Sequence, residues 1–393
     1  MIFVFGCDGY IGNALTQRLL AEGNEVIGFD NFWRREWIKE MGSMSATPLL
    51  DMEDKAVLFS NLYRGTFSFE SIDIEGEPET LRHMFEDFKP DIVINLAHNP
   101  SAPYSMKSRY QAEMVLSNNI LGTNNILWNI KEIVPDCHYI TIGTAGEYDH
   151  YCNIDIEEGY TKFEHKGRTS NEVIFPRRPG SIYHTSKTAS TYLIDYCARA
   201  WNLRCTDVMQ GIVFGIYTDE IVNSKIYSRL DSDEAGGTVI NRFILQAILG
   251  MPLTIYGKGD HQRTFLSLND SVQALMLAVK NPAEKGKVQV WNQLSEWHSM
   301  NSIADMVEIV AETLFPMSLE VEKKWIETPR LEFTGDHYYN YISDNLKNLG
   351  YKPTRKIEDE IVYMFETLMP MKDELFPLEN VVEPKIGFRR DEK

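Results

Sequence analysis

The sequence predicts an α/β fold in which a doubly wound parallel sheet is joined by a smaller, mixed α/β lobe. Three observations predict it. Short apolar segments of strand length alternate with helical patterns from residue 2 to residue 210. A glycine-rich turn connects the first strand to the first helix. The second strand ends in an acidic residue about twenty positions after that turn, as in a βαβ unit.

The first βα turn follows a strand pattern at Ile2–Phe5 and contains three regularly spaced glycines, Gly6, Gly9 and Gly12. Glycines lack the Cβ atoms that would block close approach of a pyrophosphate, and the N-terminus of the next helix offers free amide donors. We therefore expect this turn to hold a dinucleotide. Its other expected contacts are Tyr10 and Ile11.

The second strand, Glu25–Phe29, ends in Asp30, which Asn31 follows. A carboxylate at this position accepts hydrogen bonds from the ribose hydroxyls of an adenosine and repels a 2′-phosphate, so it favours NAD over NADP. Arg34 and Arg35 come soon after, and free cations there would favour NADP instead. Turn, helix, strand and acid together predict a Rossmann-type domain that binds NAD.

Four more strand patterns follow, Thr66–Ser71, Asp91–Ala97, His138–Gly143 and Leu203–Gln210. Ligands of open parallel sheets bind beyond the carboxyl ends of the strands. Asp73 and Ile74 follow the first of these strands, where a short acid could meet an adenine amino group. Thr144 and Glu147 follow the third, so we expect them beside the cofactor.

Two stretches between the strands are unusual. The helical pattern Gln111–Ile133 contains several asparagines and Gly122, which lower helix stability and so indicate close packing or a local bulge. The polar stretch 149–179 is expected to cover the site.

Tyr183 and Lys187 begin a helix one turn apart, so both side chains lie on one face of it. A tyrosine has a pKa of about 10, and a fixed ammonium beside the phenol favours the phenolate. The pair is therefore a candidate acid/base device.

After residue 212 the regular alternation breaks into segments of mixed character. We expect residues 1–212, rejoined by about 264–282, to form the NAD-binding domain, and residues 213–393 to form mainly the substrate domain. Arginines at positions 242, 263 and 330 are spread through this second part.

Composition excludes several classes of function. The formal net charge of -18 argues against a nucleic-acid backbone or an anionic membrane surface as partner. The five cysteines form no C-x-x-C pair, which is typical of reduced thiols and gives no sign of a metal site. The chain shows no basic leader and no apolar run of membrane-spanning length, so a cytoplasmic location is expected.

Five signals occur in a fixed order along the chain: Gly6-x-x-Gly9-x-x-Gly12, Asp30, Asn119-x-x-Gly122-Thr123, Thr144 and Tyr183-x-x-x-Lys187. With them the whole chain resembles the extended short-chain dehydrogenase/reductase family of nucleotide-sugar enzymes. Within that family it is most similar to the UDP-sulfoquinovose synthases. The stretches that carry this likeness are Ser101–Met106, Gly146–Tyr148, Asn153–Tyr160, Tyr183–Lys187, Gln210–Val213, Asn241–Phe243 and Tyr256–Gly259.

The resemblance implies NAD as cofactor, UDP-glucose and sulfite as substrates, and a homodimer. UDP-glucose would become UDP-6-sulfoquinovose through 4-keto and enone intermediates. The implied cofactor contacts are Gly6, Gly9, Tyr10, Ile11, Gly12, Asp30, Asn31, Asp73, Ile74, Leu96, Ala97, His98, Asn119, Tyr183, Lys187, Gln210 and Val213. The implied substrate contacts are Arg109, Thr144, His184, Gln210, Asn241, Arg242, Tyr256, Gln262, Arg263 and Arg330, with Arg263 and Arg330 on the diphosphate.

The resemblance also implies the catalytic set Thr144, Glu147, Tyr183 and Lys187. Tyr183 would take the proton of the sugar 4-hydroxyl, Lys187 would lower the tyrosine pKa, and Thr144 would hydrogen-bond the same oxygen. Glu147 is the expected base at C5, with Tyr183 or Thr144 as alternatives. Pro100 stands where those synthases carry a basic residue, so Arg109 or His184 is expected to hold sulfite.

Two other interpretations stay open. A UDP-glucose 4-epimerase or a nucleotide-sugar 4,6-dehydratase of the same family would need no sulfite, although an epimerase has no use for a base at C5. A non-catalytic NAD-binding protein would have no use for the Tyr183 and Lys187 pair.

Overall fold

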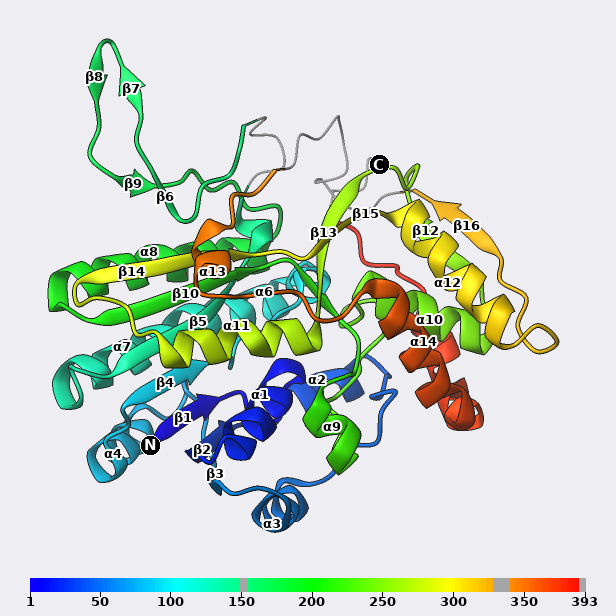
Figure 1. Cartoon of the computed structure of the whole chain (residues 1–393), viewed down its shortest axis with the longest axis horizontal. Coiled ribbons are helices and arrows are strands. Elements are labelled where there is room, and N and C mark those ends of the chain that lie inside the picture. Colours follow the sequence, from blue (N-terminus) through cyan, green and yellow to red (C-terminus); the bar gives the residue numbers. More distant parts are fainter. Residues whose placement is uncertain (149–153, 328–339, 389–393) are drawn as a thin grey trace.

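A seven-stranded parallel sheet forms the centre of the computed structural model, which describes residues 1–148, 154–327 and 340–388 (Figure 1). The strand order is β14-β10-β5-β4-β1-β2-β3, and neighbouring strands pair in parallel. The strands are β1 (Ile2–Phe5), β2 (Glu25–Asp30), β3 (Thr66–Ser71), β4 (Ile92–Asn95), β5 (His138–Thr144), β10 (Arg204–Gln210) and β14 (Lys287–Gln293). The doubly wound α/β fold that the sequence predicts is confirmed.

Helices cover both faces of the sheet (Figure 1). On one face lie α1 (Tyr10–Ala21) and α11 (Leu268–Lys280); on the other lie α4 (Pro78–Phe88), α6 (Arg109–Leu116), α7 (Gly122–Ile133) and α8 (Ile182–Trp201). Side chains alternate between the faces along each strand, so Val4 packs with the first group of helices and Phe3 with the second. A strand buried on both faces needs an unbroken apolar run, which explains the composition of β1.

The predicted irregularity in the stretch 111–133 is a π-helical turn, η1 (Ser117–Leu121), between α6 and α7. Gly122, the next residue, packs directly against Ile74, and a side chain at this position would clash with that isoleucine. Both expectations for this stretch, a bulge and close packing, are therefore confirmed.

A second lobe lies at the carboxyl ends of the sheet strands (Figure 1). Its core is formed by α10 (Val239–Leu249), α12 (Met300–Leu314) and α14 (Ile357–Leu368). Two small sheets complete it: β11 (Ile212–Phe214), β13 (Gln262–Ser267) and β15 (Glu296–Ser299) form one, and β12 (Leu253–Tyr256) with β16 (Lys323–Ile326) forms the other. The lobe therefore faces the edge of the sheet at which a ligand is expected.

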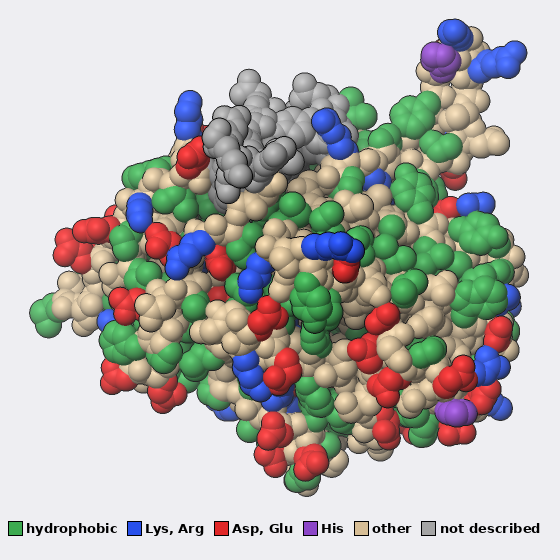
Figure 2. Space-filling model, turned by 180° about the vertical axis from the view of Figure 1, so that it is seen from behind, with side chains coloured by type: hydrophobic (Ala, Val, Ile, Leu, Met, Phe, Trp, Pro, Cys, Tyr) green, Lys and Arg blue, Asp and Glu red, His purple; other side chains and the backbone are tan. Residues whose placement is uncertain are grey.

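The remaining elements are short or peripheral. They are α2 (Trp33–Glu40), α3 (Met52–Leu62), α5 (Ala102–Ser105), α9 (Asp219–Ser224), α13 (Asp344–Asn348) and α15 (Lys372–Leu375), the ladder of β6 (Tyr160–Thr161) with β9 (Val173–Ile174), and the ladder of β7 (Glu164–His165) with β8 (Arg168–Thr169). The β7–β8 hairpin projects from the body of the molecule (Figures 1 and 2). Among the described residues, no helix is both long and apolar enough to cross a membrane.

Candidate active site

A cavity of about 470 Å³ lies between the carboxyl ends of the sheet strands and the second lobe. Thr144 at the end of β5 and Gln210 at the end of β10 are register partners, so their side chains reach the cavity together. Described residues of the stretch 154–179 do not line it. Within that part of the predicted cover, Phe175 joins a separate apolar cluster with Tyr148, whereas the β7–β8 hairpin projects from the body of the molecule.

The glycine turn at one end of the cavity is sterically constrained. Gly6 has a φ of +81°, and a Cβ there would lie 2.7 Å from the backbone of Leu96. A Cβ at Gly12 would collide with the carbonyl oxygen of Gly6. The glycines thus let the turn close tightly onto the start of α1, where free amide donors suit a pyrophosphate.

Asp30 lies beside this turn and lines the cavity. Its carboxylate accepts hydrogen bonds from the backbone N–H groups of Asp8 (3.0 Å) and Phe32 (2.9 Å). Burial, followed by the charge of Asp8, raises the pKa of Asp30 to about 6. With only two backbone donors bound, the Asp30 carboxylate keeps free lone pairs that can accept from ribose hydroxyls. This geometry fits the predicted role of Asp30 in holding the ribose.

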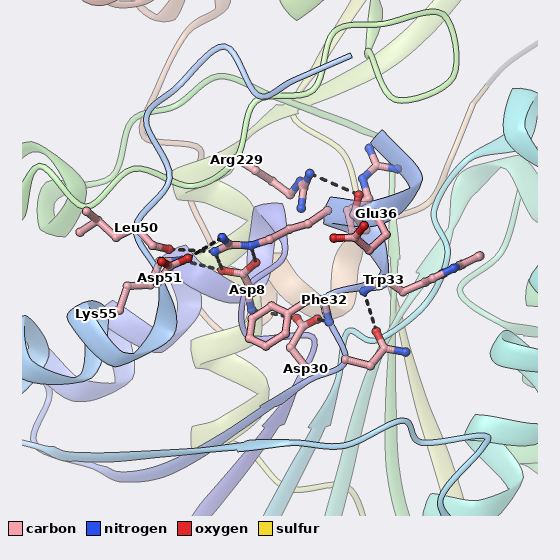
Figure 3. Close-up of polar contacts among 12 residues, drawn as sticks. Asp8, Asp30, Phe32, Trp33, Glu36, Leu50, Asp51, Lys55 and Arg229 are labelled. Atoms are coloured by element: carbon pink, nitrogen blue, oxygen red, sulfur yellow. Dashed lines mark hydrogen bonds and ion pairs between the residues drawn. The ribbon is translucent and has the colours of Figure 1, made fainter. Parts of the chain in front are cut away.

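Arg34 and Arg35 are both engaged by carboxylates within the protein. Arg35 Nε and Nη2 donate to Asp8 at 2.7 and 2.9 Å (Figure 3). Arg34 pairs with Asp231 at 2.8 Å. Lys55, whose side chain is 1% exposed, adds a second cation to Asp8 at 2.8 Å. Burial raises the pKa of Asp8, but Arg35 and Lys55 lower it more, so the pKa stays below its usual value. Both arginines are therefore paired with carboxylates, although Arg34 Nη1 has no hydrogen-bond partner, and these ion pairs favour NAD over NADP.

Most residues predicted to hold the cofactor line the cavity: Gly6, Gly9, Tyr10, Ile11, Gly12, Asp30, Asn31, Ile74, Leu96, Ala97, His98, Tyr183, Lys187, Gln210 and Val213. Two of them lie behind its wall. Asp73 accepts a hydrogen bond from Asn31 Nδ2 at 3.0 Å, and the buried Asn119 accepts one from the backbone N–H of Asn99 at 2.8 Å. In this structure both orient lining residues rather than face the cavity.

Tyr183 and Lys187 both line the cavity from the first turns of α8. Lys187 Nζ lies 3.0 Å from Nδ1 of His98. Burial and, to a smaller extent, the positive charge of Lys187 lower the pKa of His98 well below its usual value, which keeps the imidazole neutral. Burial, followed by the charge of Glu147, raises the pKa of Tyr183, whereas its hydrogen bond with Thr144 lowers it.

Glu147 does not reach the cavity. It is fully buried behind Thr144, in the short helix η2 (Ala145–Glu147). Its Oε1 accepts the backbone N–H of Thr144 at 3.2 Å, which completes a capping box, and its Oε2 accepts from Arg177 at 3.2 Å. A carboxylate held this way cannot meet a sugar, so the structure places the expected C5 base in a supporting position.

The imidazole of His184 occupies the space beside Gly146, where any other side chain would collide with its Nε2 edge. Its Nδ1 lies 3.0 Å from Ser181 Oγ, the N-cap of α8. His184 and Tyr183 lie next to each other, with ring centroids 5.0 Å apart. Two proton-transfer groups therefore line the cavity side by side, next to Thr144.

The predicted substrate residues divide into three groups. Asn241, Arg242, Tyr256 and Arg263 line the far end of the cavity, with Thr144, His184 and Gln210 nearer the sheet. Gln262 does not line it, and Arg109 is 90% exposed and paired with Glu113, which places it away from any bound sulfite. Arg330 lies outside the described residues.

Several lining residues were not predicted from the sequence. Among them are Trp33, Arg34 and Trp37 of α2, Arg229, Asp231 and residues 235–238 of the segment before α10, and Val239, the first residue of α10. The charged repeat Arg229-x-Asp231-x-Asp233 was the available signal. No local periodicity indicates that this segment crosses to the other lobe.

Comparison with known proteins identifies the family of the chain. Residues 2–292 match the model of the NAD dependent epimerase/dehydratase family. The chain is 36% identical over 390 residues to the UDP-sulfoquinovose synthase of Sulfolobus acidocaldarius, covering 99% of this chain and 98% of that one. It is 38% identical over 353 residues to the chloroplastic UDP-sulfoquinovose synthase of Spinacia oleracea, covering 90% of this chain and 72% of that one.

Among solved structures, the UDP-glucose 4-epimerase of Thermotoga maritima in complex with UDP-glucose has a TM-score of 0.68 at 20% identity, covering 93% of this chain and 99% of that one. This likeness shows the fold. A Rossmann-type sheet with a glycine turn and a Tyr-x-x-x-Lys pair at one cavity defines an NAD-dependent enzyme of the short-chain dehydrogenase/reductase type. The chain belongs to the NAD-dependent epimerase/dehydratase family.

Proposed function

We propose that this chain is a UDP-sulfoquinovose synthase, which converts UDP-glucose and sulfite to UDP-sulfoquinovose and water. The observation that carries the proposal is the similarity over nearly the full length of the chain to the archaeal enzyme of that name. The cavity supports it, because the Tyr183 and Thr144 pair lies between the glycine turn and the arginines of the second lobe.

The first step is proton removal from the sugar 4-hydroxyl, for which Tyr183 is the acceptor. Thr144 forms a hydrogen bond with the phenol oxygen of Tyr183 and so fixes the position of that oxygen. NAD, when bound, accepts the C4 hydride and later returns it. Lys187 supplies a positive charge at the same cavity, where its Nζ lies 3.0 Å from Nδ1 of the neutral His98.

The 4-ketone acidifies the proton at C5, and a base must then remove it so that the 6-hydroxyl can leave as water. We assign this base to His184, because Glu147 is held behind Thr144 and His184 lines the cavity beside Tyr183. Sulfite then adds through sulfur at C6 of the enone, C5 regains a proton, and the returned hydride restores the alcohol at C4. Arg242 and Arg263 hold the diphosphate, for which guanidinium groups are suited.

The two parts of the chain bind different ligands in this function. Residues 1–212, with about 264–282, hold the cofactor, and residues 213–393 mainly hold the nucleotide sugar. The packing of α11 against α1 supports this division, because α11 lies in sequence between β13 and β15 of the second lobe and yet packs on the cofactor sheet.

We also propose that the protein is a homodimer that pairs through α7 and α8. Trp128 of α7 and Tyr192 and Tyr196 of α8 are 40%, 48% and 57% exposed. Hydrophobic side chains gather on this face of the molecule (Figure 2). Such a patch marks an interface in soluble proteins. Tyr196→Asp should shift the mass measured by light scattering from dimer to monomer, and a monomeric wild type would refute the arrangement.

The experiment that tests the function is incubation of the purified chain with UDP-glucose, with and without sulfite, followed by mass analysis. A product that appears only with sulfite, and has the mass of UDP-sulfoquinovose, supports the proposal. UDP-galactose as the product, whether or not sulfite is present, would identify a 4-epimerase instead. Tyr183→Phe is the control and should give no product from either mixture while still binding NAD.

A further inference from the structure

An irregular segment of the second lobe crosses over the cofactor end of the cavity. It runs from residue 226 to residue 237, between α9 and α10, and we call it the strap. The strap, all of which the structure describes, forms neither helix nor strand, yet each of its residues is buried or half-buried. Burial of an irregular backbone requires that its polar groups find partners elsewhere.

The strap finds those partners in the NAD-binding part of the chain. Gln17 of α1 donates to the carbonyl oxygen of Ile226 at 2.9 Å. Thr47 donates to the carbonyl oxygen of Ser228 at 2.7 Å, and the backbone N–H of Ala46 donates to that of Leu230 at 2.8 Å. Near its other end, Ser101 donates to the carbonyl oxygen of Ala235. The strap is therefore fixed across the cofactor end from both sides.

Arg229 is one of the strap residues that line the cavity. Its side chain is 3% exposed, and its Nε and Nη2 donate to Asp231 at 2.8 and 3.2 Å. Nη2 also lies 3.5 Å from the carbonyl oxygen of Arg34, just beyond Asp30 (Figure 3). The remaining nitrogen, Nη1, is buried without a hydrogen-bond partner, although Arg229 lines the cavity. A buried, charged donor without an acceptor is costly.

The neighbours of Arg229 indicate what the missing acceptor is. Ser228 accepts a hydrogen bond from Asn13 Nδ2 at 3.2 Å, and Asn13 directly follows the last glycine of the turn. Arg229 thus follows a residue that contacts the start of α1, next to the glycine turn, and itself contacts Arg34 of α2, the helix that begins shortly after Asp30. The glycine turn and Asp30 are the expected sites of the pyrophosphate and of the ribose. The pyrophosphate is the anionic part of NAD, and a guanidinium donates well to phosphate oxygens.

We propose that Arg229 is a cofactor-binding residue, whose free Nη1 donates to the pyrophosphate of NAD from the side opposite the glycine turn. Asp231 holds the guanidinium in place for this contact. The inference depends on NAD binding, which family membership supports, and not on sulfite or on the identity of the sugar.

Arg229→Gln tests the proposal in the full-length protein freed of cofactor. Dissociation constants are measured for ADP-ribose and for adenosine by tryptophan fluorescence, since Trp33 and Trp37 line the cavity. We expect the dissociation constant for ADP-ribose to rise about 10- to 100-fold, and that for adenosine to change less than about twofold. Arg229→Lys should recover part of the loss. Arg204→Gln, a half-buried arginine outside the cavity, is the control and should change neither.

Two results would overturn the proposal. An equal loss of affinity for both ligands would show that Arg229 only holds the strap in place, and an unchanged affinity for ADP-ribose would show that it makes no contact with the phosphates. If Arg229→Gln does not fold, the comparison is made on Arg229→Lys, for which a smaller loss, restricted to ADP-ribose, is expected. The NAD content of each variant after gel filtration gives a second measurement that is independent of activity.

Discussion

Glu147 and Arg177 form an ion pair that is closed to solvent. Glu147 Oε2 accepts a hydrogen bond from Arg177 Nη1 at 3.2 Å, and the two side chains are 0% and 1% exposed. Thr191 Oγ1 donates to the same carboxylate oxygen at 3.0 Å. The pair lies directly behind Thr144, so it determines where the threonine meets the phenol of Tyr183.

Glu147→Gln should therefore lower the free energy of unfolding. The substitution leaves the guanidinium of Arg177 buried without its counter-charge, and breaking such a pair costs about 3–5 kcal/mol. Urea denaturation of wild type and variant measures the difference. Glu113→Gln is the control, because its partner Arg109 is 90% exposed and pairs of that kind contribute less than about 1 kcal/mol. Equal stability of Glu147→Gln and wild type would contradict the supporting role.

The binding of NAD should depend on pH through Asp30. Burial, followed by the charge of Asp8, raises its pKa to about 6 in the cofactor-free protein. Ribose hydroxyls donate to the carboxylate, so binding requires the deprotonated form, which dominates only above that pKa. Affinity should be constant above pH 6 and fall by up to about tenfold per unit below it.

Dissociation constants for NAD measured between about pH 5 and pH 8 check this expectation. Asp30→Asn cannot titrate, so its affinity should be weaker throughout and nearly independent of pH in this range. The same fall of affinity at low pH in Asp30→Asn and in wild type would assign the dependence to another group.

The buried cation beside the glycine turn should be important for stability. Lys55 Nζ lies 2.8 Å from Asp8, and the two side chains are 1% and 3% exposed. Lys55→Met leaves that carboxylate with Arg35 alone, and we expect a loss of about 3 kcal/mol in the free energy of unfolding. Lys39→Met, at a side chain that is 70% exposed, should cost less than about 0.5 kcal/mol in the same measurement. A similar effect of both substitutions would show that Asp8 needs no second cation.

The sequence predicted the parts of this molecule that local patterns determine. The strand, the glycine turn, the helix and Asp30 follow each other within one βαβ unit, and each leaves a short-range signal. Glu147 was different. Its distance of three residues from Thr144 fits a place beside the substrate, but it is also the spacing of a capping box, which turns the carboxylate back toward the chain.

Long-range contacts account for the rest of what the sequence did not reveal. Arg229 meets the cofactor end through a segment that pairs with residues about two hundred positions earlier, and no periodicity marks such a crossing. Strand β14 was missed because it joins the sheet from between β13 and β15 of the second lobe, far in sequence from the other strands of the sheet. Arg109 is the first residue of α6 and points to solvent. Its direction depends on how α6 packs against α8, which the sequence pattern does not indicate.

His184→Gln should separate the oxidation at C4 from the chemistry at C5. Tyr183 and Thr144 remain in place, so UDP-glucose should still reduce the bound cofactor, which absorbance at about 340 nm reports. Without the imidazole the C5 proton stays, so deuterium from heavy water should enter C5 at least about a hundredfold more slowly than in wild type. Tyr183→Phe should lose both signals. Normal exchange at C5 in His184→Gln would instead assign the role of the C5 base to Tyr183 or Thr144, which also line the cavity.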